Sequence, residues 1–468
     1  MNCPFAAKGC GGCAGISEKY GDLLRQKEAA FRRLFPQAQP IVGAQEPRCY
    51  RNKVLRSFAN GKTSLYHGMY RAGTHQIISV NRCLLENEQA NGIANTALSI
   101  LADMGLPAYR EDFHRGVLRH MQVRRAHRTG QALVTVITGG DQFPQGEEFA
   151  KELMRRCPDV RGVIHNVNPR GDSAVMGSQS RLLAGRDEIW DVMSGLRVCL
   201  TSRSFYQVNT VQAEKLYRRA IEMAGLSGGD SALDAYCGVG VIGMLAAKQA
   251  GQAMGIEQVP DAVRCAKKAA AYNKIDHISF VCGDTAQALR KGDFAPSVIF
   301  MDPPRAGCSR QFLDSAIACA PKRMVYISCN PQTLRRDADI LQQSGYCIET
   351  VQPFDLFPYT EHVETVLLLS KGEISTKSIR VEFPLDELDT SCLLNDATYP
   401  QIKNYVLEHT GLKVSSLYIA QVKAKHGIIE RECYNKAKSE NTKVPQCPPE
   451  KEKAIEDALR YFNLIEPK

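Results

Sequence analysis

The sequence lacks any hydrophobic run that could cross a membrane, since no apolar stretch approaches the roughly 18 residues that a spanning helix needs. It also lacks a signal peptide, because the first residues, MNCPFAAKGCGGCAG, have neither a charged start nor an apolar core. We therefore expect a cytoplasmic protein without a membrane partner. In that compartment most of the 17 cysteines should be reduced, with a minority acting as metal ligands or in catalysis.

A strong excess of charge and an internal repeat are missing as well. The chain has 59 lysines and arginines against 50 acidic residues, and its net charge of +9 permits a polyanionic partner such as RNA without requiring one. At 468 residues the chain is too long for one compact core. Several domains are therefore expected.

The hydrophobic pattern changes along the chain and predicts four regions. Residues 1–90 begin with a loop rich in cysteine and glycine and continue with a helix within 15–35, whereas residues 91–200 read mostly as strands. In residues 201–371 strands alternate with helices, which predicts a parallel sheet covered on both faces. Residues 372–468 form an extension, in which we expect a strand at 379–383 and helices near 398–409, 414–426 and 450–462. Its helical pair fits either a helix-turn-helix-like binding module or a plain packing domain.

A glycine-rich turn follows the strand expected at residues 231–236. Gly238 and Gly240 allow the backbone to approach a ligand closely, and Glu257 ends the next strand, where a carboxylate can hold both hydroxyls of a ribose. This arrangement favours a nucleotide-type cofactor. Taken alone, it leaves NAD and S-adenosylmethionine both open.

Three reactive side chains stand at the ends of expected strands. Asp302 precedes two prolines, Cys329 lies in a Ser-Cys-Asn-Pro sequence, and Glu364 belongs to a His-Val-Glu sequence. Pro331 starts a helix, so we expect the helix dipole to favour the thiolate form of Cys329. Because active residues of such sheets gather at the carboxyl ends of the strands, the thiol and the two carboxylates should meet there.

A thiol beside a carboxylate fits methylation at carbon 5 of uracil. Carbon 5 is a poor nucleophile until a thiolate attacks carbon 6 and makes carbon 5 enolate-like, so that it can take a methyl group from a sulfonium donor. A base must then remove the proton from carbon 5 so that the thiol is expelled. These needs favour S-adenosylmethionine over NAD.

Five ordered motifs resemble those of the RNA uracil-5-methyltransferase family over roughly residues 1–371. They are Phe205-Tyr-Gln207-Val-Asn209, Asp234-Ala-Tyr236-Cys-Gly, Asp302-Pro-Pro-Arg305, Ser328-Cys329-Asn-Pro and His362-Val-Glu364. The resemblance implies an α/β fold with a class I (Rossmann-like) methyltransferase sheet and an inserted, mostly-β RNA-binding domain. It further implies Cys329 as the nucleophile and Glu364 as the base, with contacts to the methyl donor from Gln207, Tyr236, Glu257 and Asp302.

The first cysteines, Cys3-x6-Cys10-x2-Cys13, are spaced tightly enough for a metal site, but the spacing does not reveal a fourth ligand. The ribosomal RNA branch of the family carries a [4Fe-4S] cluster with its fourth cysteine downstream, and the resemblance implies Cys83 in that place. Four thiolates suit an iron–sulfur cluster or, as the alternative, zinc. This branch feature implies 23S ribosomal RNA as the partner.

The target base must leave its stack to meet a thiol and a sulfonium together. We expect the strand-rich region to supply the RNA-binding surface, through Tyr50, Arg51, Arg119, Arg124 and Arg125. Alternative functions are a tRNA uracil-5-methyltransferase, a cytosine-5 methyltransferase, which the His-Val-Glu and Ser-Cys-Asn-Pro motifs disfavour, and an iron–sulfur RNA-binding regulator without catalysis.

Overall fold

The computed structural model describes residues 3–372 except 14, 63, 173 and 293, and residues 399–426, 447–462 and 464–465. Contacts within the chain separate it into a unit of residues 1–375 and a unit of residues 376–468. The strand expected at 379–383 lies outside the described residues. Among the described helices, none combines the length and the apolar character needed to cross a membrane.

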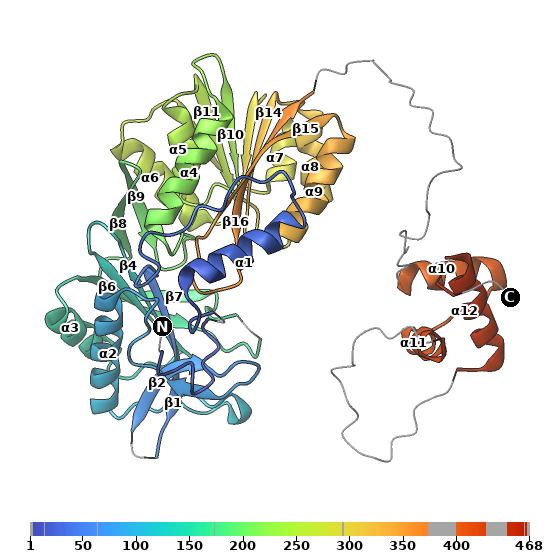
Figure 1. The fold of residues 1–468 in the computed structure, drawn as a ribbon. Helices are drawn as coiled ribbons and strands as arrows, with labels where there is room; N and C mark the ends of the chain where they lie inside the picture. Colours follow the sequence, from blue (N-terminus) through green and yellow to red (C-terminus); the bar gives the residue numbers. More distant parts are fainter. Residues whose placement is uncertain are drawn as a thin grey trace. The chain divides into compact units, whose positions relative to one another are not determined.

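The first unit contains a seven-stranded sheet of the Rossmann-like kind, which confirms the predicted fold class (Figure 1). Side by side, its strands are β12 (Ile278–Cys282), β11 (Gln252–Glu257), β10 (Ser231–Ala235), β13 (Val298–Met301), β14 (Arg323–Ser328), β16 (Glu364–Lys371) and β15 (Tyr346–Phe354). The first five run parallel, whereas β16 is antiparallel to both of its neighbours. Because β16 is antiparallel, its first residue lies at the same edge of the sheet as the carboxyl ends of the parallel strands.

Helices cover both faces of this sheet and define two hydrophobic cores. One core includes side chains from α4 (Thr210–Ala224), α5 (Val241–Ala247) and α6 (Pro260–Tyr272). The other includes side chains from α1 (Tyr20–Arg32), α7 (Thr285–Lys291), α8 (Arg310–Ala318) and α9 (Pro331–Gln343). Local sequence sets the helix starts, since Pro260 and Pro331 occupy first turns, and Asn209 and Asn330 cap α4 and α9 with their side chains.

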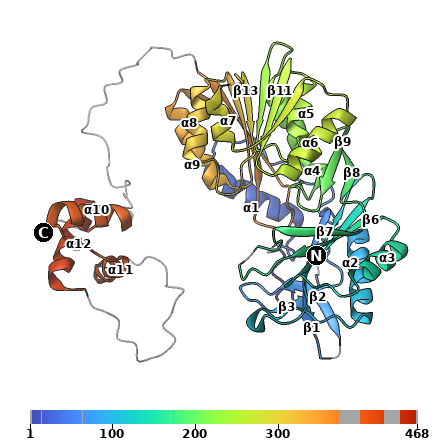
Figure 2. The same ribbon diagram turned by 180° about the vertical axis from the view of Figure 1, so that it is seen from behind.

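A second seven-stranded sheet lies at the other end of the same unit (Figures 1 and 2). Its strands, side by side, are β3 (Ile77–Ser79), β2 (Leu65–Tyr70), β1 (Lys53–Asn60), β4 (Leu118–Arg125), β5 (Ala132–Thr138), β6 (Val160–Val167) and β7 (Gln179–Gly185). This sheet draws strands from both sides of residue 90, where we had expected a domain boundary. Its core is completed by α2 (Glu88–Asp103) and α3 (Gly146–Arg156), two helices in a region expected to be mostly strands.

A hairpin of β8 (Glu188–Met193) and β9 (Leu196–Thr201) follows this sheet and packs into the core formed by α4–α6. The hairpin therefore joins the second sheet to the Rossmann-like sheet. It leads directly into the Phe205-Tyr-Gln207 motif.

The second unit contains α10 (Tyr399–Thr410), α11 (Ser416–Lys425) and α12 (Pro449–Tyr461). Ile402, Val406, Ile419, Ile455 and Leu459 are fully buried between them. The three helices thus share a small hydrophobic core of their own.

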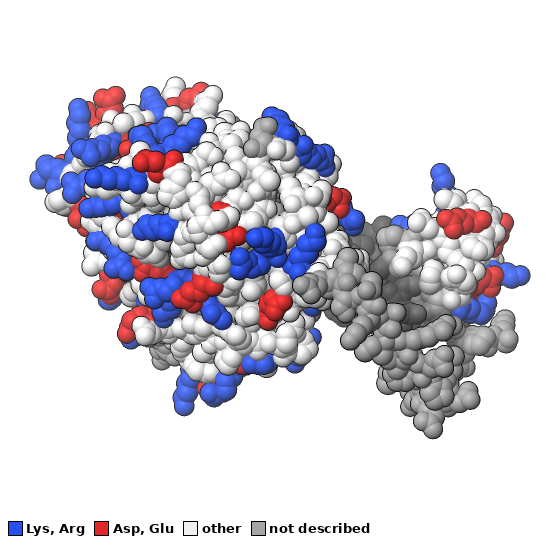
Figure 3. Space-filling view, turned by 90° about the horizontal axis from the view of Figure 1, so that it is seen from above, with Lys and Arg blue, Asp and Glu red and all other residues white. Residues whose placement is uncertain are grey.

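Basic side chains do not gather into one patch on the face shown in Figure 3, where they are interspersed with acidic ones. Charge on this face therefore does not single out an RNA-binding surface.

Candidate active site

Asp302, Cys329 and Glu364 stand at the ends of neighbouring strands, as expected. Asp302 follows β13, Cys329 follows β14, and Glu364 is the first residue of β16. Ser328 pairs in register with Thr365, so the antiparallel pairing of β14 and β16 brings Cys329 and Glu364 to the same edge of the sheet. Sequence positions 302, 329 and 364 thus converge in space.

Burial dominates the electrostatics of the two carboxyl groups. It raises the pKa of Asp302 to about 7. Burial, reinforced by the nearby Asp302, raises the pKa of Glu364 to about 8. The side chain of Glu364 is only 3% exposed, and its Oε2 is buried without a hydrogen bond among the described residues. A carboxylate with such a pKa and a free oxygen is suited to accept a proton near neutral pH.

The expectation that the helix dipole would favour a Cys329 thiolate is not met. Burial, followed by the negative charges of Glu364 and Asp302, raises the pKa of the Cys329 thiol to about 11, although Arg305 opposes the shift. Cys329 lies just before Asn330, the residue that caps α9, and so outside the helix itself. The thiol is therefore protonated at neutral pH in the free protein, and a ligand or base must promote its ionisation.

A pocket of about 340 Å³ opens beside Cys329. Arg305 and His362 form part of its wall and contact each other through Nη2 and Nε2, 3.0 Å apart. Phe31 and Leu34 supply apolar side chains to the same wall. Its volume lies within the range that ordinary small-molecule sites occupy.

The glycine-rich turn has the geometry that close approach of a nucleotide requires. Gly238 and Gly240 adopt φ values of +55° and +80°, in the left-handed region that suits glycine. Glu257 braces this turn, because its Oε2 accepts a hydrogen bond from Gly238 N at 3.0 Å and its Oε1 accepts one from Val259 N at 2.8 Å. Tyr236 packs edge-on against Phe312, with 5.2 Å between the ring centroids.

The residues around this turn fit a cationic nucleotide donor. Asp234 accepts a hydrogen bond from Gly243 N at 2.6 Å, but its other oxygen is buried without a partner among the described residues. Burial raises the pKa of Asp234 to about 8. Together with Asp302 and Glu364, it forms a group of buried carboxyls whose ionised forms a bound sulfonium would stabilise.

Tyr217 lies beside the candidate site, and the sequence analysis missed it. It lies on α4, is 7% exposed, and has the polar side chain of Gln207 near enough to lower the pKa of its phenol. Burial, together with the charges of Asp302 and Glu364, holds its pKa well above the usual value. The phenol therefore stays protonated and can orient Gln207 toward the carboxyl pair. The usable signal was the amphipathic helix after the Gln207 motif, which we had not placed.

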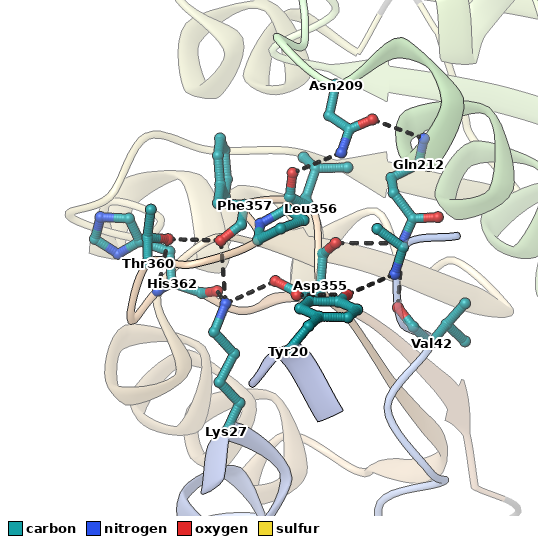
Figure 4. Close-up of polar contacts among 12 residues, drawn as sticks. Tyr20, Lys27, Val42, Asn209, Gln212, Asp355, Leu356, Phe357, Thr360 and His362 are labelled. Atoms are coloured by element: carbon teal, nitrogen blue, oxygen red, sulfur yellow. Dashed lines mark hydrogen bonds and ion pairs between the residues drawn. The ribbon is translucent and has the colours of Figure 1, made fainter. Parts of the chain in front are cut away.

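The loop between β15 and β16, which ends at Glu364, is fastened to α1 by a buried lysine (Figure 4). Lys27 Nζ donates to Asp355 Oδ1 at 2.6 Å, to the Phe357 carbonyl at 3.1 Å and to the His362 carbonyl at 3.0 Å. Tyr20 adds a hydrogen bond from its hydroxyl to Asp355 Oδ2 at 2.8 Å. Helix α1 thereby fixes the segment that leads to the carboxylate.

The four expected metal ligands, Cys3, Cys10, Cys13 and Cys83, line one small pocket at the N-terminal end of the chain. Burial raises the pKa of Cys13 to about 11 and that of Cys83 to about 12. Within the part of the chain that the structure describes, no group of three or more histidine, cysteine or acidic side chains is arranged to hold a metal ion. The four thiols therefore line the same pocket, but the described residues do not form an arranged metal site there.

Three of the residues expected to contact RNA, Tyr50, Arg119 and Arg124, are instead part of the protein interior. Arg119 and Arg124 are 5% and 2% exposed. Arg124 Nη2 donates to the Ser204 carbonyl at 2.7 Å, and Arg119 Nη1 donates to two backbone carbonyls. Tyr50 is also buried, and its hydroxyl donates to the Pro358 carbonyl. These side chains satisfy backbone acceptors, so they are not exposed phosphate contacts.

Comparison with known proteins places this site in a family. Residues 194–372 match the family model for tRNA (uracil-5-)-methyltransferase. Proteins described as uncharacterized RNA methyltransferases are similar over most of the chain. The one from Bacillus cereus is 35% identical, with 78% of this chain and 82% of its own length aligned, and the one from Listeria monocytogenes is 37% identical, with 77% and 82% aligned.

Among solved structures, that of the Pyrococcus abyssi tRNA (uracil-54, C5)-methyltransferase with S-adenosyl-L-homocysteine has a similar fold. It has a TM-score of 0.65 at 23% identity and covers 77% of this chain and 84% of its own. The fold and the site define an α/β methyltransferase with a nucleotide turn and a thiol–carboxyl centre. The chain belongs to the RNA uracil-5-methyltransferase family and is an S-adenosylmethionine-dependent enzyme of that class.

Proposed function

We propose that this enzyme methylates carbon 5 of one uridine in 23S ribosomal RNA, with Cys329 as nucleophile and Glu364 as base. The observation that supports these roles most directly is the meeting of the thiol with a buried carboxyl of raised pKa at one edge of the sheet. Gln207, Tyr236, Glu257 and Asp302 are proposed to contact the donor. Residues 91–200, together with the earlier strands that complete the second sheet, are proposed to bind RNA, and the enzyme is proposed to act in the cytoplasm.

In the proposed reaction, Cys329 and Glu364 act on the uracil ring in turn. Bound S-adenosylmethionine supplies an electrophilic methyl group. The Cys329 thiol gives up its proton to a base, its sulfur bonds to carbon 6 of uracil, and the electron pair of the C5–C6 double bond moves to carbon 5. Carbon 5 then takes the methyl group, the bond between that methyl and the sulfonium sulfur breaks, and S-adenosylhomocysteine is released. Glu364 then removes the proton from carbon 5, the bond between sulfur and carbon 6 breaks, and the thiolate leaves. Arg305 favours the thiolate, because it lowers the pKa of Cys329.

The proposal of ribosomal RNA rests on the cysteine set. Cys3, Cys10, Cys13 and Cys83 would hold a [4Fe-4S] cluster, with zinc as the alternative, and they line one pocket. Methyl transfer needs no electron, so the metal would shape the loop or contact RNA. Iron and sulfide analysis of anaerobically purified protein tests this assignment, and a stoichiometric zinc content would replace the cluster with zinc.

The activity test follows tritium release from carbon-5-labelled uridine in unmodified 23S ribosomal RNA and, separately, in tRNA. We expect release from ribosomal RNA by the wild type and by Cys282→Ala, a control thiol that is exposed at the end of β12, but not by Cys329→Ala. Release from tRNA alone would show that the substrate is tRNA and that the reaction at carbon 5 is the one proposed. Binding of the donor without release from either RNA would refute the reaction and favour a non-catalytic RNA-binding regulator.

A further inference from the structure

Two adjoining cavities lie on the second sheet, away from the strand ends that carry Cys329. They have volumes of about 310 and 610 Å³ and share Tyr70, His75, Glu111, Arg119 and His120 in their walls. We call this combined space the β4 pocket, because Arg119 and His120 lie on β4. No step of the methyl transfer uses these residues, so the pocket has no role in the reaction described above.

Arg119, in the wall of the β4 pocket, is held in one position by several contacts. Arg119 Nη1 donates to the carbonyls of Asn168 and Arg170 at 2.6 and 2.7 Å, and its Nη2 donates to Glu111 Oε1 at 2.6 Å. The guanidinium also lies 5.5 Å from the centroid of the Tyr109 ring. Because three acceptors fix this side chain, the wall is preorganised and a ligand need not order it.

His120 offers the pocket a neutral hydrogen-bonding group. It is 7% exposed, and its Nδ1 lies 3.0 Å from Ser57 Oγ, while its Nε2 makes no hydrogen bond with any residue that the structure describes. Burial and the charge of Arg119 lower its pKa to about 4. The imidazole therefore presents Nε2 to the cavity without a positive charge, as a partner for a neutral ligand.

The walls combine aromatic faces with carboxylate acceptors. Phe58, Tyr70 and Tyr109 supply rings, and Glu111 and Asp112 supply oxygens. Carboxylates at the rim repel phosphate but accept hydrogen bonds from amino groups, and aromatic rings stack on bases. Adenine, cytosine and guanine each carry an exocyclic amino group with two N–H donors, whereas uracil offers only its single ring N–H donor. The chemistry fits an unstacked base other than uracil.

The pocket is physically connected to the catalytic sheet through β4. Gln122 and Arg124 follow His120 by two and four residues on β4. Gln122 Nε2 donates to the Ser202 carbonyl at 2.9 Å, and Arg124 Nη2 donates to the Ser204 carbonyl. Residues 202–204 lead directly to Gln207. With about 3.3 Å per residue, the strand spans roughly 13 Å between His120 and Arg124.

We propose that the β4 pocket binds a second unstacked base of the RNA substrate, one that carries an exocyclic amino group and is not the methylated uridine. This proposal rests on RNA being the substrate, and it does not depend on which RNA is methylated. The pocket would then select the sequence around the target, while the strand-end site performs the chemistry. Sequence-specific reading of single-stranded RNA by stacking and base-edge hydrogen bonds is the recognition mode that such a pocket supports.

The first test compares Tyr70→Ala/His75→Ala with Tyr272→Ala, using 23S ribosomal RNA, or tRNA if that is what the wild type methylates. Tyr70 is 38% exposed in the pocket, whereas the control Tyr272 is 59% exposed on α6. Loss of base stacking should raise KM for RNA about tenfold, with kcat at saturating RNA and the affinity for S-adenosylmethionine within about twofold of the wild type. An unchanged KM for RNA would overturn the proposal.

The second test needs no variant. Ultraviolet cross-linking of the wild-type protein to the same RNA, followed by mass spectrometry, should join the peptide containing Tyr70 or Tyr109 to an adenine, cytosine or guanine. Cross-links confined to other peptides, or a cross-link of these peptides to the methylated uridine itself, would refute the assignment. Failure of the methylation roles would show separately, as absence of tritium release while the cross-link persists.

Discussion

Replacement of Lys27 by methionine should uncouple the catalytic loop from α1. Lys27 and Asp355 are 4% and 0% exposed at their side chains, and the change leaves a buried carboxylate without its cation. It also leaves the Phe357 and His362 carbonyls without the donor that now joins them to α1. The segment that ends at Glu364 would then be free to shift.

Removing one partner from a buried ion pair costs about 3–5 kcal/mol of stability, because the remaining charge is not compensated. Tyr20 still donates to Asp355, which places the expected loss for Lys27→Met at the lower end, about 3 kcal/mol. Lys268→Met is the matched control. Its ion pair with Glu188 is exposed and should contribute less than about 1 kcal/mol.

The assay has a stability arm and a kinetic arm. Urea unfolding should show that Lys27→Met/Asp355→Asn is more stable than Lys27→Met alone, because no buried charge is left unpaired. Single-turnover methylation by folded Lys27→Met should be slower by about ten- to a hundredfold, with KM for S-adenosylmethionine nearly unchanged, since a shift of about 1 Å in a reacting group has that effect. Additive losses of stability, or a wild-type rate in folded Lys27→Met, would refute the reasoning.

The remaining predictions concern the site itself. Alkylation of Cys329 by iodoacetamide, without substrates, should accelerate steadily from pH 7 to 10, since the thiol pKa is about 11, and a plateau by pH 8 would contradict that pKa. Arg305→Met should slow this alkylation at pH 9, whereas Glu364→Gln should accelerate it, because they remove a favourable and an unfavourable charge. Glu364→Gln should also raise the unfolding free energy at pH 9 by on the order of 2–4 kcal/mol. The Glu364 pKa is raised to about 8, so wild-type stability is lost as pH rises from about 4.5 through 8. Urea titrations showing equal stability of wild type and Glu364→Gln at pH 9 would refute that penalty. Tyr217→Phe should raise KM for S-adenosylmethionine several-fold by loss of the phenol oxygen near Gln207, and an unchanged KM would remove Tyr217 from the donor site.

Much of the catalytic sheet could be read from the sequence because its signals are local. One of the helices in the alternation expected over residues 201–371 is α6, Pro260–Tyr272, whose proline marks its start. One of the strands in that alternation is β14, Arg323–Ser328, an apolar run that ends at the Ser328-Cys329-Asn-Pro motif. Two residues of the predicted site, Cys329 and Glu364, share one sheet edge as expected, since β14 ends where the antiparallel β16 begins.

Features that depend on distant partners could not be read in this way. The ionisation of Cys329 is governed by burial and by Glu364, 35 positions later, which outweigh the local helix start. Helices α2 and α3 were missed in the strand-rich region, although Asn87 caps the first of them and Ala90, Ala94, Ala97 and Leu101 repeat along its buried face. Alanine gives a weak hydrophobic signal, so tertiary packing decided these elements.

The contact between Lys27 and Asp355 joins residues 328 positions apart. During synthesis, α1 leaves the ribosome long before the loop and the strand β16 that complete its environment. Phe31 and the charged end of Lys27 on α1 therefore remain exposed to water until almost the whole first unit has been synthesised. Contacts of such separation slow folding and prolong exposure of apolar surface. Early chain release before residue 371 should consequently yield an aggregation-prone product rather than a smaller active enzyme.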